Sequence, residues 1–580
     1  MHRHGAQLLD ATSARFALWA PDARSVSVEI EQQPPVELLP DNDGWYTGTA
    51  PCQAGDRYHY RIDGKLQVAD PASRYQPEGV QGPSELVDVA SYDWQHPWQG
   101  RPWHEAVIQE LHVGVLGGYA GVARQLPRLA DIGISAVELM PLGQFPGERN
   151  WGYDGVLPFA PQNTYGSPQQ LCALVDKAHG EGLMVLVDVV YNHFGPDGNY
   201  LHQYASPFFR EDQQTPWGAA IDFRRAEVRE FFIQNALMWL CDYRCDGLRL
   251  DAVHAIDQPD FLVELAQRVR AAVEPGRHVW LVLENEHNQA FLLEQGFDAQ
   301  WNDDGHNALH VLLTGETEGY YADYKQRPID QLARCLSEGF VFQGQANRHG
   351  EPRGEPSGHL APSAFVLFLQ NHDQIGNRAL GERLTRLCPP PALRAATGLL
   401  LLAPMIPLLF MGDDDGSCRP FLFFTDFHDE LADAVREGRR GEFAHFTAFA
   451  DPAQRERIPD PNAEQTFESS RPQHNEVIAG WHGLYQQLLD LRRRHVIPHL
   501  PGSRALGADV HGDKALSARW RLGDGNTLRI DLNLAASPQA VELPPAATRL
   551  FDSSDNRHPD THLAAYSCVV SLIPPGQERP

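Results

Sequence analysis

The sequence is poor in basic residues and has no long apolar segment, and each shortage excludes a class of partner. Its 580 residues include 48 Lys and Arg against 76 Asp and Glu, a formal net charge of −28. A surface this negative repels phosphate backbones and anionic headgroups, so we expect no nucleic-acid and no membrane partner. The most apolar stretch, residues 398–411, has 14 residues and two prolines. A bilayer span needs about 20 residues, and the N-terminus lacks a signal-peptide core, so we expect a cytoplasmic protein.

Cysteine and cofactor motifs are also scarce. The eight cysteines are scattered and form no C-x-x-C. Cys241 and Cys245 could share a helix face, but two sulfurs do not make a tetrahedral metal site, and we interpret both as buried structural thiols. No G-x-G-x-x-G or P-loop follows an apolar run, and no D-x-D-x-D-G calcium loop occurs. We therefore expect no cofactor and no metal ligand.

The two ends of the chain have the pattern of β-structure. Short β-branched or aromatic runs bounded by turn residues predict an N-terminal β-sandwich, carbohydrate-binding or immunoglobulin-like, over residues 1–100. Residues 91–102, rich in Trp, Pro and Gln, are typical of a linker. A second set of runs predicts a C-terminal β-sandwich over residues 496–580. The predicted strands are 17–19, 26–30, 44–48 and 58–62 at the first end, and 517–522, 526–534, 540–543 and 567–573 at the second.

Between them, residues 101–495 alternate between strand-like and helix-like segments. Near-continuous apolar strands are typical of a parallel sheet that is covered on both faces. The helix after the third run begins with a capping box formed by Ser167 and Gln170, with Pro168 at the first helical position. The apolar runs are residues 107–113, 134–140, 183–190, 247–251, 279–283, 364–370 and 408–411. At least seven strands favour an α/β fold of the (β/α)8 TIM-barrel type, with insertions.

Carboxylates follow several of these strands, at the barrel end where active sites lie. Asp188, Asp251, Glu284 and Asp373 each close an apolar run, and Arg249 lies two residues before Asp251 on the same strand face. One such acid alone is more often a helix cap or an ion-pair partner. The full set favours glycosyl transfer, in which one carboxylate attacks the anomeric carbon and a protonated one donates to the leaving oxygen.

Aromatic and histidine side chains accompany these acids. Trp151 and Tyr153 follow the second strand, where either could stack on a pyranose ring or simply cover the barrel rim. His193 and His372 lie beside strand-end polar clusters and could donate hydrogen bonds to sugar hydroxyls. Asp188 with His193 offers too few ligands for a metal hydrolase.

Four segments in order resemble the signature segments of the α-amylase superfamily: residues 188–193, 247–254, 283–284 and 371–373. This resemblance implies a retaining mechanism. Asp251 would be the nucleophile, Glu284 the general acid/base, and Asp373 the residue that grips sugar hydroxyls as the transition state forms. Arg249 would keep Asp251 ionised through its opposite charge.

Within that superfamily the chain is most similar to the maltooligosyltrehalose trehalohydrolase family. The segments that carry the likeness are residues 70–79, 110–114, 145–154, 251–256, 297–301, 319–323 and 369–378. The resemblance implies hydrolysis of the α-1,4 bond that joins a malto-oligosaccharide to its terminal trehalose. It implies a pathway link, without implied physical contact, to maltooligosyltrehalose synthase. The substrate contacts expected are Trp151, Tyr153, Asp188, His193, Arg249, His254, Asp303, Asp304, His306, His372, Gln374 and Asn377.

The chain departs from this family at three places. Gly305 and Asn307 stand where the family usually has an aromatic residue and a second histidine, residues 412–416 lack an aromatic residue, and the loop after Gly114 is shorter than expected for the family. We expect these positions on the substrate rim, where they would affect affinity rather than chemistry. A glycogen-branching enzyme is the alternative within the superfamily, although residues 70–79 and 297–301 argue against it. A non-catalytic glycan-binding protein is the alternative outside it, and the retention of all three acids argues against that.

Overall fold

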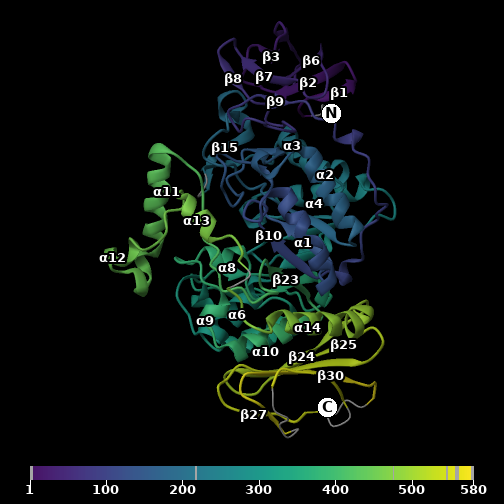
Figure 1. The fold of residues 1–580 in the computed structure, drawn as a ribbon, viewed down its shortest axis with the longest axis vertical. Coiled ribbons are helices and arrows are strands. Elements are labelled where there is room, and N and C mark those ends of the chain that lie inside the picture. The colour runs from purple at the N-terminus through teal and green to yellow at the C-terminus, as the bar shows by residue number, and fades with distance from the viewer. Residues whose placement is uncertain (1–3, 216–217, 474–475, 544–546, 555–560, 577–580) are drawn as a thin grey trace.

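The computed structural model describes residues 4–215, 218–473, 476–543, 547–554 and 561–576. Three parts follow one another along the long axis of the molecule (Figure 1). The N-terminal strands lie at one end, a barrel lies in the middle, and the C-terminal strands lie at the other end. A helical arm projects from the side of the barrel.

The middle part is a closed barrel of eight parallel strands, so the predicted (β/α)8 fold is confirmed. Seven of the strands coincide with the predicted apolar runs. The eighth, β19, was not predicted because it has only three residues and a polar Gln300 at its centre. The strands, in barrel order, are β10 (Ile108–Leu111), β11 (Ala136–Leu139), β14 (Met184–Val189), β17 (Gly247–Leu250), β18 (Trp280–Leu283), β19 (Ala299–Trp301), β22 (Phe365–Phe368) and β23 (Ile406–Phe410).

Helices cover the outside of the barrel. Helix α2 has the predicted capping box, because Ser167 Oγ accepts from the Gln170 N–H and the Gln170 side chain accepts from the Ser167 N–H. Its apolar stripe, which includes Leu171 and Val175, is buried. The helices are α1 (Gly118–Ile132), α2 (Pro168–Gly180), α3 (Ala226–Leu237), α4 (Pro259–Ala272), α5 (Ala290–Glu294), α6 (Asp303–Thr314), α7 (Pro328–Glu338), α8 (His372–Gly376), α9 (Leu384–Leu387), α10 (Pro390–Leu402) and α14 (Trp481–His495).

Insertions after the strands build the rim of the barrel. Three are two-stranded ribbons, and the longest is the arm, residues 429–469, which follows β23 and stands out in green in Figure 1. Arg439 of the arm donates to the carbonyls of Gly376 and Arg378, so the arm is fastened to the segment that follows β22. The ribbons are β12 (Gly143–Gln144) with β13 (Leu157–Pro161), β15 (Phe209–Thr215) with β16 (Gly218–Ile221), and β20 (Gln345–Ala346) with β21 (Pro352–Arg353); the arm contains α11 (Asp429–Glu442), α12 (Pro452–Arg455) and α13 (Glu464–Ser469).

The N-terminal part consists of two antiparallel sheets around buried residues such as Phe16, Val28 and Tyr58. The linker after them runs along the barrel, where Trp98 Nε1 donates to Asp246 and its ring stacks on His179. One sheet joins β1 (Gln7–Asp10), β2 (Ser13–Trp19), β6 (Trp45–Pro51) and β5 (Leu39–Pro40); the other joins β4 (Val36–Glu37), β3 (Val26–Ile30), β7 (Arg57–Ile62), β8 (Leu66–Val68) and β9 (Ser84–Glu85). The exact domain boundaries near residues 100 and 495 stay a prediction.

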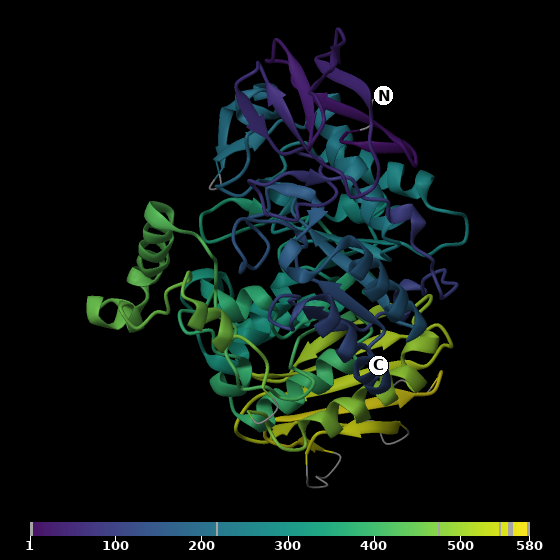
Figure 2. The same ribbon diagram turned by 45° about the horizontal axis from the view of Figure 1, so that its top comes forward.

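The C-terminal part is a five-stranded antiparallel sheet with a small second layer. One face lies against α7 and α10, where Trp520 Nε1 donates to the Leu336 carbonyl. The strands of this sheet are yellow in Figure 2. The second layer is a two-stranded ribbon, and Val541, Leu563 and Val569 pack together beneath it. The sheet consists of β24 (Arg504–Val510), β25 (Ala515–Arg521), β26 (Thr527–Asn533), β30 (Ser567–Ile573) and β28 (Thr548–Asp552), and the ribbon of β27 (Gln539–Ala540) and β29 (His562–Leu563).

Two expectations from composition can be compared with the described residues. All eight cysteines are free thiols. Cys245 is buried as predicted, but the prediction was wrong for Cys241, which is exposed on the π-helical turn Met238–Asp242. Within the described ranges, no helix is both long enough and apolar enough to cross a bilayer.

Candidate active site

The strand-end acids meet around one buried cation. Arg249 Nη1 lies 2.7 Å from Asp188 Oδ2 and 2.9 Å from Asp251 Oδ1, and Nη2 lies 2.8 Å from Glu284 Oε2. The guanidinium is fully buried and lies over the ring of Trp301, 4.0 Å from its centroid. Three adjacent strands therefore deliver their carboxylates to a single arginine, whose planar fork fixes their relative positions.

Asp251 receives a second set of donors from the neighbouring strand end. Asn192 Nδ2 lies 2.8 Å from Asp251 Oδ2 and also donates to the Asp251 carbonyl. The arginine and the amide together stabilise negative charge on this carboxylate, because hydrogen bonds to an ionised acceptor are the strong ones. The next residue, Ala252, has a left-handed backbone with φ of 40°, and its N–H points at Glu284 Oε2 over 2.8 Å.

Glu284 is in an environment that favours its protonated form. Burial raises the pKa of Glu284 well above its usual range, against the lowering effect of Arg249, and the charges of Asp251 and Asp373 raise it further. Burial and the neighbouring Asp373 likewise raise the pKa of Asp303 to about 7. A carboxyl group that holds a proton at neutral pH can act as a general acid.

Asp373 is paired with a buried histidine. His372 Nδ1 lies 2.5 Å from Glu110 Oε1, and Nε2 lies 3.3 Å from Asp373 Oδ1. Burial alone would lower the pKa of His372, but the carboxylates of Asp373 and Glu110 outweigh it and raise that pKa well above its usual value. Burial would raise the pKa of Asp373, but the charged His372 and Arg249 keep it low. Asp373 therefore differs from Glu284 in favouring the ionised form.

The two aromatic candidates take different positions. Tyr153 donates to Asp188 Oδ2 over 2.6 Å, and its ring stacks on His372 with centroids 5.1 Å apart. Trp151 is buried behind His372, which it meets edge-on at 5.4 Å, and its Nε1 donates to the Leu422 carbonyl. Tyr153 thus belongs to the site itself, whereas Trp151 supports it from behind.

The acids open toward solvent on one side. The side chain of Asp251 is 11% exposed, that of Glu284 19%, and that of Asp373 35%. His193 is held beneath them by Asn192 Oδ1 and by the Tyr153 carbonyl. Among the three acids, Asp373 is therefore the most accessible to solvent and Asp251 the least.

The sequence of a known enzyme aligns with most of this chain. A malto-oligosyltrehalose trehalohydrolase from Deinococcus radiodurans is 40% identical over 541 residues, which cover 91% of this chain and 88% of that enzyme. The chain belongs to the malto-oligosyltrehalose trehalohydrolase family. It is therefore a glycoside hydrolase. Residues 100–217 match the family model described as alpha amylase, catalytic domain, and residues 503–570 match a domain of unknown function, DUF3459.

Two further proteins are similar to this chain, one in structure and one in part of its sequence. A Salmonella typhimurium protein of known crystal structure, provisionally named an alpha amylase, is 39% identical with a TM-score of 0.92, and the match covers 98% of this chain and 99% of that one. A 1,4-alpha-glucan branching enzyme from Pseudoalteromonas atlantica is 31% identical, but the match covers only 47% of this chain and 43% of that enzyme.

Some side chains that were expected to contact substrate instead bond to, or pack against, other parts of the protein. Asp304 is fully buried and accepts from Asn288, Tyr324 and the backbone N–H groups of Val341 and Phe342. His306 is buried against Phe368, and burial lowers its pKa to about 3. Gln374 uses its side-chain oxygen to cap α8 at the Asn371 N–H. Asp304 and His306 are buried and Gln374 is partly exposed, and a contact of any of the three with substrate stays a prediction.

The other expected contacts lie close to the acids. Asp303 is half-buried at the start of α6, where Asp373 is the charge that most raises its pKa. Asn377 Nδ2 lies 3.2 Å from Asp373 Oδ1. His254 is half-buried beside Glu286, with its Nε2 3.9 Å from Glu286 Oε2. All three side chains are at least partly exposed, and their contact with substrate stays a prediction.

The departures from the family pattern were expected on the rim, and this was wrong for Gly305 and Asp414. A Cβ at Gly305 would meet Leu367, whose side chain points outward from β22, so Gly305 is a helix-to-barrel packing position. Asp414 accepts from Gln109 of β10 and pairs with Arg128 of α1. Glu110 faces His372 inside the barrel, and side chains alternate along a strand, so Gln109 and Asp414 lie outside the barrel wall.

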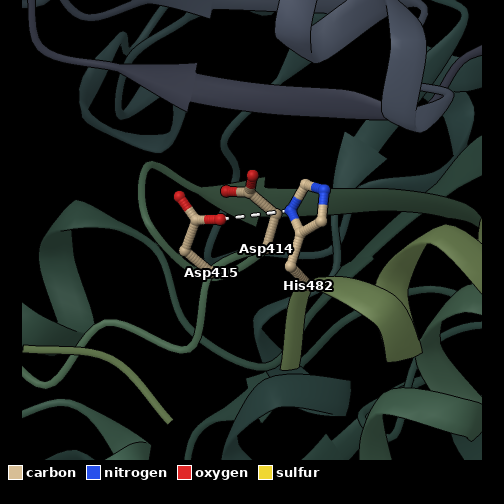
Figure 3. Close-up of side chains that lie close together, drawn as sticks. All are labelled: Asp414, Asp415 and His482. Carbon is tan, nitrogen blue, oxygen red and sulfur yellow. Dashed lines mark hydrogen bonds and ion pairs between the residues drawn. The ribbon is translucent and has the colours of Figure 1, made fainter. Parts of the chain in front are cut away.

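Asp414, Asp415 and His482 form the one group of metal-ligand type found among the described residues (Figure 3). Asp415 Oδ1 lies 3.2 Å from His482 Nδ1. Arg128 also approaches both carboxylates, and at Asp415 the distance is 3.5 Å. The guanidinium already supplies the positive charge that a metal ion would bring, so this group is an ion-pair cluster that fastens α14 to α1.

Four residues of the site escaped sequence reasoning. Glu110 and Asn192 hold His372 and Asp251, and each lies within a segment that carried the family resemblance. Tyr320 is 75% exposed, and Asp373 is the nearby charge that most raises its pKa after burial. Arg353 pairs with Asp304 at 3.2 Å. Tyr320 could have been found, because it lies in residues 319–323, a segment that carries the family resemblance. Arg353 lies in a polar loop outside these segments.

Proposed function

We propose that this protein hydrolyses the α-1,4-glucosidic bond next to the terminal trehalose of malto-oligosyl trehalose and releases free trehalose. The observation that carries the proposal is the set of three acids around Arg249 and His372, in a chain that belongs to this family along nearly its full length. The relatives carry this substrate in their names, and the acids supply the chemistry that the reaction needs.

In the first step Asp251 attacks the anomeric carbon and Glu284 protonates the glycosidic oxygen, so that trehalose leaves and a glycosyl-enzyme ester forms. In the second step Glu284, now ionised, takes a proton from water, which attacks the same carbon and frees Asp251. One guanidinium holds both carboxylates, which keeps them close, and a close pair favours retention over inversion.

Asp373 and His372 would act on the sugar hydroxyls. The ionised Asp373 accepts hydrogen bonds from two adjacent hydroxyls, and these bonds strengthen as positive charge grows on the ring. Tyr153, stacked on His372, offers an aromatic face to the sugar bound over Asp251. Trp301 beneath Arg249 excludes water from the other side of the guanidinium.

The test uses two substrates. Purified protein is incubated with maltopentaosyl trehalose and, separately, with maltohexaose, and the products are resolved by chromatography. We expect trehalose and maltopentaose from the first and almost no products from the second. Cleavage of both into mixed short sugars would instead indicate a general amylase. Asp251→Ala should lower the rate by orders of magnitude while the circular dichroism spectrum stays unchanged.

A glycogen-branching enzyme is the second candidate, because a branching enzyme matches 47% of this chain. It would transfer the glycosyl group to a sugar hydroxyl rather than to water. New α-1,6 links in the product, detected by debranching, together with absence of free trehalose, would favour it over the hydrolase.

We also infer a sequential pathway link and a cytoplasmic location. The substrate requires a preceding isomerisation that converts the reducing end of a malto-oligosaccharide into trehalose, as a maltooligosyltrehalose synthase would perform. Cell fractionation with an antibody against the chain tests the location, and recovery from the culture medium would contradict it.

A further inference from the structure

Glu110 is fully buried near the end of β10, and both of its carboxylate oxygens bind His372. Its Oε1 lies 2.5 Å from His372 Nδ1, and its Oε2 accepts from the His372 backbone N–H at 2.9 Å. These two contacts join β10 to the first residue of α8. One carboxylate therefore fixes both the ring and the backbone of the residue that precedes Asp373.

Both ring nitrogens of His372 face carboxylate oxygens. Nδ1 faces Glu110, and Nε2 lies 3.3 Å from Asp373 Oδ1. A neutral imidazole has one N–H and supplies a hydrogen to only one of these acceptors, whereas a doubly protonated ring supplies one to each. The ring of Tyr153 stacks on the imidazole with centroids 5.1 Å apart, and an aromatic face attracts a cation. The geometry therefore favours a charged His372.

The charges around the ring act in the same direction. Burial lowers the pKa of His372, but the carboxylates of Asp373 and Glu110 outweigh it and raise that pKa well above its usual value. Among the described residues, these two acids are the carboxylates in contact with the ring. The other titratable groups that face the pair of His372 and Asp373, besides Arg249, are His112 of β10, Glu138 of β11, Tyr153, Glu284, Asp303 of α6 and Tyr320.

We propose that Glu110 is a positioning residue for the reaction. Its two hydrogen bonds hold His372 in one orientation with both nitrogens protonated, so that the Nε2–H remains a donor toward Asp373 and toward a sugar hydroxyl bound beside it. Glu110 is buried and touches no substrate, so it acts only through His372. This role rests on the proposed function and deepens it, because it explains how the residue that grips the sugar is kept ready.

The experiment compares two variants, Glu110→Gln and Glu138→Gln, across the pH range of activity. Glu138 is the matched control, because it lies opposite Glu110 on β11 and is equally buried. Neither of its carboxyl oxygens has a hydrogen-bond partner among the described residues, and burial raises its pKa well above the usual range. Gln at position 138 therefore replaces a neutral side chain of the same shape, and the pH profile of kcat/KM should stay as in the wild type.

Glu110→Gln removes a negative charge in contact with the imidazole. A partner charge at this distance shifts a pKa by about 1–3 units, so the ring should lose its proton that much earlier as the pH rises. For maltopentaosyl trehalose we expect the alkaline limb of kcat/KM to move to lower pH, with about a tenfold loss for each unit above the new pKa. At the acid end, where both proteins hold a charged ring, the difference should narrow. KM should stay nearly constant while kcat falls, because Asp373 acts on the transition state.

An NMR titration tests the same point without substrate. In protein labelled with ¹³C at histidine Cε1, the signal of His372 is the one missing from the His372→Asn variant. In the wild type this ring should stay doubly protonated well above the ordinary histidine pKa of about 6.5. In Glu110→Gln its titration should move to lower pH by about 1–3 units, and in Glu138→Gln it should not move.

Three results would overturn the role of Glu110. They are a wild-type His372 that is neutral at about pH 7, a pH profile that Glu110→Gln leaves unchanged, and an equal shift of the profile in both variants. The first result needs no Glu110 variant, so the test holds even if Glu110→Gln does not fold. If the wild-type protein releases no trehalose, the proposed function fails instead, and the NMR titration alone decides about Glu110.

Discussion

Glu138 is buried in surroundings that disfavour its ionised form. It lies on β11, opposite Glu110 in the adjacent strand, with only 1% of its surface exposed. Neither of its carboxyl oxygens has a hydrogen-bond partner among the described residues. Burial, and then the charge of Glu110, raise its pKa well above the usual range, against the effect of Arg249. A buried carboxyl without donors is stable only when it is protonated.

Glu138→Gln should therefore stabilise the protein more as the pH rises. The wild-type native state holds a proton on Glu138 that the unfolded state releases above about pH 4.5, so its free energy of unfolding falls with increasing pH. Gln carries no such proton, and the difference between the two free energies should grow by about 1.4 kcal/mol for each pH unit above the unfolded-state pKa, until Glu138 itself ionises in the native state. Urea unfolding at several pH values measures it, with Glu181→Gln as the exposed control. A constant difference would show that Glu138 is ionised.

At the scale of elements, a buried arginine joins the arm to the catalytic rim. Arg439 is only 8% exposed, donates to the carbonyls of Gly376 and Arg378, and lies over the rings of Phe423 and Phe443. The Gly376 carbonyl belongs to α8, which begins at His372 beside the catalytic acids. The arm is therefore bonded directly to the segment that carries Asp373.

Arg439→Met keeps the apolar volume but leaves two carbonyls without their donor. Losing such a donor costs about 1–3 kcal/mol, which raises the population of the detached arm by roughly tenfold or more. We expect limited proteolysis within residues 429–469 to become faster by that factor, while the melting temperature of the barrel stays nearly constant. Arg436→Met on the same helix, where the arginine is more exposed and pairs with Asp433, is the control. Equal cleavage rates for both variants would contradict the role of Arg439.

At the scale of the whole molecule, the C-terminal sheet and the barrel share one core. Trp520 is fully buried and donates to the Leu336 carbonyl of α7, and Lys514 donates to the Leu312 carbonyl of α6. A Cβ at Gly398 of α10 would contact Phe551 of β28 at 2.8 Å, so helix and sheet are in close contact. Such packing joins two chain segments into one cooperative unit.

Trp520→Ala should lower the stability of both parts together. Removing a fully buried tryptophan costs about 3–5 kcal/mol. We expect calorimetry to show a single transition, shifted to lower temperature, and kcat at 25 °C to stay the same because the sheet lies far from the acids. Leu506→Ala, on an exposed position of β24, should leave the transition in place. A split into two transitions would show that the sheet unfolds on its own.

Features that depend on nearby residues could be predicted from the sequence, whereas features that depend on the packing of distant segments could not. Periodicity and apolar runs predicted seven barrel strands and the α2 capping box, because these features depend on neighbours within a few residues. Strand β19 escaped because three residues give no periodicity. Gly305 and Asp414 were assigned to the rim because sequence cannot show which side of the barrel wall a loop residue faces.

By itself the sequence determined the order of the elements and the acids at their ends, because a strand carries its terminal carboxylate wherever it folds. Only the tertiary structure decided how those acids share charge. Arg249 bridges three strands, Glu110 reaches His372 across the barrel, and burial separates the protonated Glu284 from the ionised Asp373. The pKa of a carboxyl group depends on its distance to other charges and on its solvation, and closure of the barrel sets both.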